Sequence, residues 1–359
     1  MSDERSLRAD ITSRFCESLI GALPDPAMVI GDDLCVAAAN APARQLLPAL
    51  RTGEPLVLAL RAPDVLDCLR QVFVSGEAAT APWRERVPVE RHFDVRIAPL
   101  AAPRGDAQAV LLTLRDLTEI RRVDKMRVDF IANASHELRT PLASMLGFVE
   151  TLQGPARDDA RARDKFLTIM REQGRRMARL IDDLLSLSRI EQIEHVRPQT
   201  PVDLVLVARH VADTLTPLAE ELGVDLLVEA DRPVVVAGDR DELVRVAENL
   251  IENAIKYGAP SPSTNKARVE IGVARKGRQG TLSVRDFGRG IAAEHLPRLT
   301  ERFYRIDAGQ SRSKGGTGLG LAIVKHILAR HRGRLTIASE IGRGSIFIAS
   351  APLHFEQDE

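Results

Sequence analysis

Two long stripes of mostly apolar residues between Glu119 and Glu191 constrain the fold of this chain more than any other feature. In each stripe the side chains recur at alternating steps of four and three residues, which predicts two long α-helices that each bury one narrow face. Two such helices cannot enclose a core by themselves, so we expect two copies of the hairpin to pair as a four-helix bundle. The stripe positions are Ile131, Ser135, Leu138, Leu142, Met145, Val149 and Leu152 in the first helix and Phe166, Met170, Gln173, Met177, Leu180, Leu184 and Leu187 in the second.

The regions on either side of this hairpin have different patterns of apolar, polar and turn residues. The 359 residues are therefore predicted to form several domains. Residues 1–118 mix short apolar stretches with turn signals, which predicts a small α+β domain that begins with an amphipathic helix over residues 1–20. Residues 119–195 form the hairpin, and residues 201–355 alternate helices with strands, as in an α/β sandwich. In this last domain we expect helices over residues 204–222, 241–257 and 319–331, strands over residues 234–237, 269–274 and 281–284, and a hairpin turn at residues 342–344.

The composition excludes several classes of function. Lys plus Arg and Asp plus Glu both number 50, so the net charge is zero and no basic field predicts direct nucleic-acid binding. Cys16, Cys35 and Cys68 are too widely spaced for a disulfide framework or a compact zinc site, which favours thiols in a reducing cytosol. No apolar run approaches the ~20 residues that cross a bilayer. We therefore expect a cytoplasmic protein that does not itself require a membrane; association through a partner or a missing segment stays open.

The segment Ser135-His-Glu-Leu-Arg-Thr-Pro-Leu142 places a histidine on the first predicted helix. His136 follows a stripe position, so it is turned about 100° from the buried line and can face solvent. Glu137 is adjacent and can hold or accept the imidazole proton, which makes the ring more nucleophilic. Pro141 removes a helical N–H group and allows a bend beside the histidine. An isolated His-Glu pair is most often an ordinary helix surface, so the prediction depends on the whole segment.

A later helical segment carries polar groups that suit a bound nucleotide. Residues 249–257 put Asn249, Asn253 and Lys256 on one helix face through steps of four and three residues. Amide oxygens suit Mg²⁺, and a lysine ammonium suits phosphate. By itself this pattern would be read as a polar helix surface.

Two glycine-containing segments follow that helix. Asp286 stands at the end of a predicted strand, where a carboxylate can accept from an exocyclic amine, and the glycines at 288 and 290 let backbone approach a base or phosphate. The run Gly316-Thr-Gly-Leu-Gly320 opens a helix whose free N–H groups form an anion site. Its spacing is neither that of a Rossmann dinucleotide motif nor that of a P-loop. Each segment alone is a weak signal, because similar sequences make ordinary turns.

In this order the motifs resemble the sensor histidine kinases of two-component systems, from about residue 119 to residue 353. The segment around His136 resembles their phosphoacceptor box. The three later segments resemble the N, G1 and G2 boxes of an ATP-binding domain that these kinases share with heat-shock-90 chaperones, type II topoisomerases and mismatch-repair ATPases. The phosphoacceptor box and bundle look nearest to the phosphate-regulon type of sensor kinase.

The resemblance implies ATP-dependent autophosphorylation of His136 to phosphohistidine, followed by transfer to an aspartate of a response-regulator receiver domain. It implies that Glu137 acts as the base and that Thr140 orients water for a phosphatase activity toward the regulator. It also implies a homodimer formed through the helical hairpin, with Mg²⁺ held by Asn253, the phosphates flanked by Lys256 and Tyr257, and adenine read by Asp286. The ATP-binding residues implied in this way are Asn249, Asn253, Lys256, Tyr257, Asp286, Gly288, Gly290, Gly316, Thr317, Gly318, Leu319 and Gly320.

Weaker resemblances concern the regions around these motifs. Asn40-Ala-Pro-Ala43 and the Asp-x-Thr corner at Arg115-Asp-Leu-Thr118 resemble a PAS sensor domain, either ligand-binding or purely structural. His92 is read as an ordinary histidine rather than a haem ligand. Arg302-Phe-Tyr304 resembles the F box of the kinases, although Thr300 stands where that family usually has a phenylalanine. The Gly-, Ser- and basic-rich residues 307–315 are expected to form a mobile lid.

Two alternatives from other functional classes remain compatible with the nucleotide motifs. A chaperone- or topoisomerase-like ATPase would hydrolyse ATP to drive dimer clamping and would form no phosphoprotein. A degenerate kinase would act as a scaffold or a ligand-sensing module without turnover. The phosphoacceptor segment argues against the first, and the presence of Asn253, Asp286 and residues 316–320 argues against the second.

Overall fold

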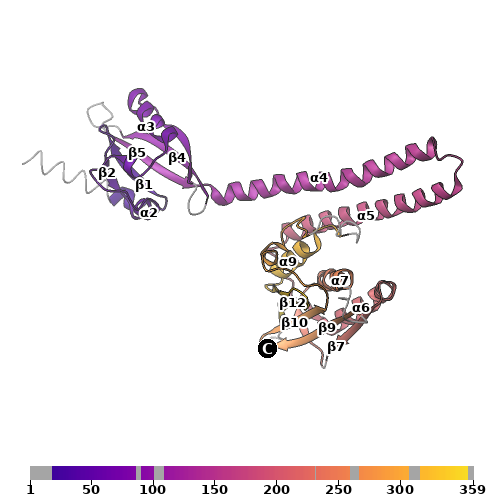
Figure 1. Ribbon diagram of the computed structural model, residues 1–359. Helices are drawn as coiled ribbons and strands as arrows, with labels where there is room; N and C mark the ends of the chain where they lie inside the picture. Colours follow the sequence, from indigo (N-terminus) through magenta and orange to yellow (C-terminus); the bar gives the residue numbers. More distant parts are fainter. Residues whose placement is uncertain are drawn as a thin grey trace, which may run out of the picture. The chain divides into compact units, whose positions relative to one another are not determined.

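The computed structural model describes residues 18–85, 90–100, 109–230, 232–258, 267–306 and 316–354. Most of the expected N-terminal helix, Cys16 and the whole expected lid over residues 307–315 lie outside these ranges. By the contacts between its residues, the chain divides into two compact units, residues 1–129 and residues 130–359 (Figure 1). This division groups most of the hairpin with the C-terminal domain, so the three domain boundaries drawn from the sequence stay a prediction.

The N-terminal unit contains an antiparallel sheet of five strands in the order β2-β1-β5-β4-β3. Alternate residues of these strands are buried, and they pack with the short helices into one core. This arrangement is the α+β domain that the sequence predicts. Its elements are β1 (Ala27–Gly31), β2 (Val36–Ala39), α2 (Ala41–Leu46), a 3₁₀ turn (Leu56–Leu58), α3 (Pro63–Ser75), β3 (Ala79–Glu85), β4 (Arg91–Leu100) and β5 (Ala109–Asp116).

Asn40 organises the start of this unit. Its side-chain oxygen caps α2 by accepting a hydrogen bond from Ala43 N, and it accepts a second one from Ala27 N, each 3.0 Å long. Its amide nitrogen donates to the carbonyls of Ile20, Leu23 and Asp25. A buried asparagine whose groups are all bonded holds the preceding segment on the sheet.

The Asp-x-Thr corner forms where β5 passes into helix α4 (Thr118–Gln153). Thr118 N donates to Asp116 Oδ1 over 2.9 Å, and Thr118 Oγ1 accepts from His92 N over 2.9 Å. Arg91 pairs with the other oxygen of the same carboxylate at 2.6 Å. The corner therefore ties the start of α4 to β4.

The hairpin consists of α4 and α5 (Ala160–Gln192), which run side by side (Figure 1). Helix α4 includes Pro141 without ending there, and Asp159 caps α5 by accepting from the backbone of residues 161 and 162. The rings of Phe148 and Phe166 stack across the hairpin with centroids 5.0 Å apart. Several large apolar side chains nevertheless stay exposed along the two helices: Ile131, Leu142, Leu146, Leu167, Ile181 and Leu185.

The C-terminal domain is an α/β sandwich, as predicted. Its mixed sheet has the order β11-β12-β10-β9-β7, and a separate two-stranded sheet pairs β6 with β8. Helices α6, α7 and α9 pack on the large sheet through a shared core. Strands β6 and β7 were not predicted. The elements are β6 (Pro201–Asp203), α6 (Leu204–Glu221), β7 (Val224–Glu229), β8 (Val235–Ala237), α7 (Arg240–Tyr257), β9 (Ala267–Lys276), β10 (Gln279–Asp286), a 3₁₀ turn (Leu296–Arg298), α9 (Gly320–Arg330), β11 (Arg334–Glu340) and β12 (Gly344–Pro352).

The position of α7 is set by both of its faces and by its cap. One face buries Leu250 and Ile251 against the sheet, which turns Asn249 and Asn253 toward the opposite side. Asp239 caps the helix, and its backbone N–H donates to Nε2 of the fully buried His331 over 3.0 Å. Because burial lowers the pKa of His331, the ring is held in the neutral form that this hydrogen bond requires.

Two further expectations concern thiols and membranes. Cys35 and Cys68 are free, half-buried thiols. None of the helices in the described ranges is both long enough and apolar enough to span a membrane.

Candidate functional site

His136 lies on the exposed side of α4, as its place beside the apolar stripe predicts. One turn later, Thr140 Oγ1 donates to the carbonyl oxygen of His136 over 3.1 Å. This is the usual bond of a helical threonine to the carbonyl four residues earlier. The carbonyl that Pro141 leaves without a helical N–H partner is that of Glu137. The imidazole is therefore accessible on the helix surface, one turn before the proline that interrupts the helical hydrogen bonding.

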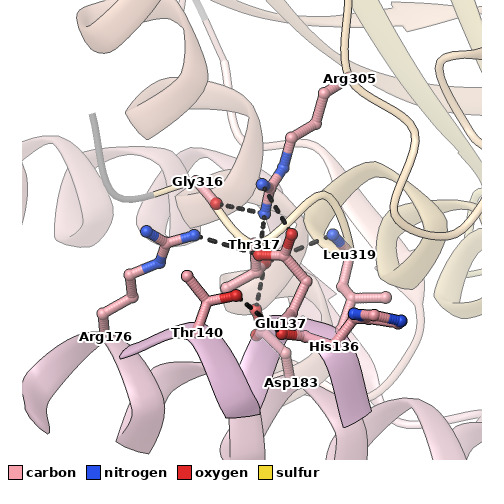
Figure 2. Close-up of polar contacts among 9 residues, drawn as sticks. All are labelled: His136, Glu137, Thr140, Arg176, Asp183, Arg305, Gly316, Thr317 and Leu319. Carbon is pink, nitrogen blue, oxygen red and sulfur yellow. Dashed lines mark hydrogen bonds and ion pairs between the residues drawn. The ribbon is translucent and has the colours of Figure 1, made fainter. Parts of the chain in front are cut away.

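Glu137 joins helix α4 to the C-terminal domain (Figure 2). Its carboxylate accepts from Arg176 of α5 at 3.1 Å and from Arg305 at 3.3 Å. Arg305 also donates to the carbonyl oxygen of Gly316 over 2.7 Å, and its side chain is only 7% exposed. The carboxylate that the sequence assigns as a base is thus bound by two guanidinium groups, and its role as a base stays a prediction.

Sequence reasoning missed both arginines. Arg305 directly follows the segment that resembles the F box, which was a usable signal, whereas nothing near Arg176 marks it as special. An aromatic contact lies close by, because the rings of Phe130 and Phe303 have centroids 5.8 Å apart. The helix that carries His136 therefore contacts the C-terminal domain through an ion pair and through packed rings.

Asp183 forms a second connection between the hairpin and the C-terminal domain (Figure 2). Thr317 Oγ1 donates to one carboxylate oxygen over 2.7 Å, and Arg245 of α7 donates to the other over 2.9 Å. The side chains of Asp183 and Arg245 are both mostly buried. Thr317 of the glycine turn and Arg245 of α7 therefore both bind Asp183 of α5.

A cavity of about 670 Å³ lies between α7, α5 and the glycine turns, within the size range of small-molecule sites. Its wall combines nearly all of the residues that the sequence assigns to ATP. From that set it includes Asn249, Asn253, Lys256, Tyr257, Asp286, Gly290, Gly316, Thr317, Gly318 and Gly320. Gly288 and Leu319 are not among the lining residues, since Gly288 packs on the carbonyl of Tyr257 and the Leu319 side chain is buried in the core.

The α7 face of the cavity is rich in oxygen ligands. Asn249 Nδ2 donates to the carbonyl of Arg245 over 2.8 Å, which orients its amide oxygen away from the helix backbone. Lys256 pairs with Glu252 at 2.6 Å. Burial raises the pKa of Glu248, which also lines the cavity. Amide and carboxylate oxygens of this kind suit a hard divalent cation.

Asp286 is a buried carboxylate in the wall of the cavity. The residue is 5% exposed, and its Oδ1 accepts a hydrogen bond from the backbone N–H of Gly288 over 3.0 Å. Burial raises its pKa, while hydrogen bonds from Gly288 and Ser345 act in the opposite direction. No basic side chain in the described ranges forms an ion pair with it. An acceptor of this kind can recognise an amine such as the exocyclic amine of a purine.

The glycine turns adopt backbone conformations that other residues rarely reach. Gly290 has φ +71° and Gly318 has φ +74°, and a Cβ at Gly290 would overlap the carbonyl of Glu340. Helix α9 begins directly afterwards, and no side chain of the described residues caps its first turn. Its first N–H groups and its dipole therefore form an anion site at the edge of the cavity.

Models of three protein families match successive parts of the chain. Residues 20–122 match the PAS fold, and residues 126–193 match the His Kinase A (phospho-acceptor) domain. Residues 238–354 match the histidine kinase-, DNA gyrase B- and HSP90-like ATPases. Together the three matches confirm the predicted fold class and the presence of an ATP-binding domain.

Curated relatives give the same result. The phosphate regulon sensor protein PhoR of Pseudomonas aeruginosa is 34% identical over 342 residues, which are 94% of this chain and 74% of that protein. The sensor protein SrrB of Staphylococcus aureus is 33% identical over 287 residues, and the chain spans only 48% of its length. Among solved structures, the histidine kinase AdeS of Acinetobacter baumannii has a TM-score of 0.48 and 24% identity, over 61% of this chain and 98% of that one.

The family match and the architecture agree with one another. The PAS fold, the phosphoacceptor domain and the ATP-binding domain follow in the order that the sequence motifs predict. The chain belongs to the sensor histidine kinases and is a PhoR-like protein-histidine kinase of a two-component system.

Proposed function

We propose that the chain transfers the γ-phosphoryl group of ATP to His136 and then passes it to an aspartate of a response-regulator receiver domain. The observation that supports this most directly is the connection from Glu137 through Arg305 to Gly316. It joins the residue next to His136 to the glycine turn at the cavity edge by contacts of 3.3 and 2.7 Å. The phosphoacceptor box therefore lies beside the anion-binding end of the candidate nucleotide site.

In this proposal different residues of the cavity bind the base, the phosphates and the metal ion of the nucleotide. Asp286 accepts from the adenine amine, and the N-terminus of α9 with Lys256 binds the phosphates. Asn253 holds Mg²⁺, and the oxygen-rich face of α7, with Asn249 and Glu248 in the same wall, fits such a cation. Bound Mg²⁺ neutralises phosphate charge.

The transfer needs little covalent chemistry from the protein. The imidazole of His136 attacks the γ-phosphorus, a nitrogen–phosphorus bond forms, and the bond to the bridging oxygen breaks to release ADP. Glu137 is assigned as the base: it accepts the proton on the other ring nitrogen, and the free lone pair of the imidazole attacks the phosphorus. Positioning and charge neutralisation supply most of the rate, as in other phosphoryl transfers.

The proposal is tested by incubating the full chain with Mg²⁺ and ATP radiolabelled at the γ-phosphate, then adding a receiver domain. We expect a label on the chain that is lost in acid and stable in alkali, and that moves to the receiver on mixing. Steady hydrolysis of ATP without any labelled protein would instead support a clamp-type ATPase. Nucleotide binding with neither hydrolysis nor label would support a non-catalytic scaffold.

Thr140 is proposed to orient water for removing the phosphoryl group from the regulator. Replacing Thr140 with alanine should lower this phosphatase activity about tenfold while autophosphorylation stays within about twofold, because the hydroxyl acts on water rather than on ATP. Thr151→Ala is a matched control, since Thr151 Oγ1 makes the same type of bond to the carbonyl of Gly147 on the same helix. Equal loss of both activities in Thr140→Ala would contradict the assignment.

The exposed apolar side chains of the hairpin are proposed to pack against a second copy of the chain. Leu146 and Leu185 are 55% and 54% exposed. Each directly follows a position of the stripes whose spacing predicts a bundle, Met145 and Leu184. Burying one leucine fully contributes about 1.5–3 kcal/mol, so several such residues from each chain can hold a stable dimer.

The double variant Leu146→Glu/Leu185→Glu should therefore be a monomer, because the dimer would bury four carboxylates without partners. Light scattering after size-exclusion chromatography measures the change in mass, and circular dichroism checks that the helices remain. The control is Leu206→Glu, which adds a carboxylate at an exposed leucine of α6 outside the hairpin. A double variant that remains dimeric would show that another surface forms the dimer.

The chain is also proposed to act in the cytoplasm, where ATP is available, without contacting nucleic acid and without requiring a membrane of its own. The absence of net charge argues against a nucleic-acid partner, and the free thiols of Cys35 and Cys68 fit a reducing cytosol. Fractionation of cells that express the chain would test it.

A further inference from the structure

We propose that Arg179, on hairpin helix α5, binds the terminal phosphate of ATP and so completes the nucleotide site from outside the ATP-binding domain. The inference rests on the ATP-binding part of the proposed function and assigns a residue to the same site. None of the sequence motifs includes this arginine. Three observations support the assignment.

The first observation is that α5 forms part of the cavity wall. Arg179, Asp182 and Asp183 all line the cavity that the glycine turns and α7 enclose. The helix is fixed there, since Asp183 accepts from Thr317 over 2.7 Å and from Arg245 over 2.9 Å. Arg179 is one turn before Asp183 and therefore shares its face of the helix.

The second observation is the position of Arg179 along α5. Three residues before it, Arg176 pairs with Glu137 beside the phosphoacceptor histidine (Figure 2). Four residues after it, Asp183 holds Thr317 of the glycine turn. Arg179 therefore lies on the stretch of α5 between the phosphoacceptor box and the phosphate end of the cavity, where the transferred group has to pass.

The third observation concerns the charges of the cavity wall. Arg245 is paired with Asp183, Lys256 with Glu252 and Arg305 with Glu137, and Arg289 is also engaged. Arg179 has neither an ion pair nor a side-chain hydrogen bond with any residue in the described ranges. Its positive charge is thus available to a ligand without first breaking a contact within the protein.

The chemistry of the ligand fits this position. A triphosphate carries several negative charges, and a guanidinium group can bind two phosphate oxygens at once through its planar fork. An arginine supplied from a neighbouring domain can also stabilise the charge that develops on the phosphoryl group during transfer. Because α5 carries Arg179, the affinity for ATP depends on contact between the hairpin and the ATP-binding domain.

The test compares Arg179→Ala and Arg179→Lys with Arg171→Ala in the full chain. Arg171 is exposed on the same helix and does not line the cavity. We expect Arg179→Ala to weaken binding of a non-hydrolysable ATP analogue about tenfold, and binding of ADP by no more than about twofold. At saturating ATP, labelling of His136 should slow at least about tenfold. Arg179→Lys should recover part of the affinity, because it keeps the charge but not the fork.

Unchanged discrimination between the ATP analogue and ADP in Arg179→Ala would overturn the inference. An equal loss of affinity for both nucleotides with a lowered melting temperature would also overturn it, because it would show a structural role. Nucleotide binding is measured independently of labelling. If the wild-type chain formed no phosphohistidine while Arg179→Ala selectively lost affinity for the ATP analogue, the proposed kinase reaction would fail and this inference would stand.

Discussion

The variant His136→Gln should lose all of the acid-labile label while its affinity for ATP stays within about twofold of the wild type. The imidazole is the nucleophile in the proposed reaction, and a glutamine amide of similar length cannot form a nitrogen–phosphorus bond under the same conditions. His136 is exposed and does not line the cavity, so its replacement leaves the nucleotide contacts in place. The expected effect on labelling is complete loss.

Two measurements separate loss of the acceptor from loss of the fold. Nucleotide binding is measured with a fluorescent ATP analogue, and the melting temperature of the variant is compared with that of the wild type. His210→Gln is the control, because His210 is also an exposed helical histidine and has no proposed role. Residual label in His136→Gln that is acid-labile and alkali-stable would place the phosphoryl group on another histidine.

The variant Asp286→Asn should lose nucleotide binding by more than about a hundredfold and should nevertheless be more thermally stable than the wild type at neutral pH. A site that hydrogen-bonds a polar group of its ligand loses much of its affinity when the buried acceptor is replaced. The asparagine amide can present an N–H donor to the adenine amine, which is itself a donor. The gain in stability comes from removing a buried carboxylate that has no ion-pair partner in the described ranges.

The pH dependence of this gain has a defined sign. Burial raises the pKa of Asp286 in the folded state above its value in the unfolded chain. The protonated carboxyl therefore favours folding below the unfolded pKa, and this contribution is lost as the pH rises through the folded pKa. The difference in melting temperature between Asp286→Asn and the wild type should be largest near neutral pH and should shrink as the pH falls through the folded pKa.

Thermal melts from neutral to acid pH measure this difference, and the exposed residue Asp213 provides the control. Asp213→Asn should change neither the stability nor its pH dependence, since that carboxylate is in solvent in both states. A nucleotide affinity like that of the wild type in Asp286→Asn would show that this carboxylate does not contact the base. A melting temperature of Asp286→Asn below that of the wild type at neutral pH would show that the hydrogen bonds from Gly288 and Ser345 outweigh the cost of removing the carboxylate from water.

The elements that carry the motifs could be predicted because their patterns are local. The face of α7 that carries Asn249 and Asn253 follows from the period of its buried residues. His136 is exposed as predicted, but the stripe residues Ile131 and Leu142 are exposed as well, because two helices cannot enclose a core by themselves. The strands β6 and β7 could not be predicted in the same way. They are only three and six residues long, and they are defined by pairing with β8 and β9 rather than by a periodic run of their own.

The sequence by itself determined the family, the order of the domains and the residue types of the cavity, because a helical period and a glycine turn are set by neighbours in the chain. Only the tertiary structure decided which charges meet. Glu137 and Arg305 are 168 residues apart, and Asp183 and Thr317 are 134 apart. The local sequence does not distinguish Arg176, Arg179 or Asp183 from ordinary surface residues. A charged residue on a helix is expected to be exposed to solvent, and only the packing of another domain against it changes that expectation.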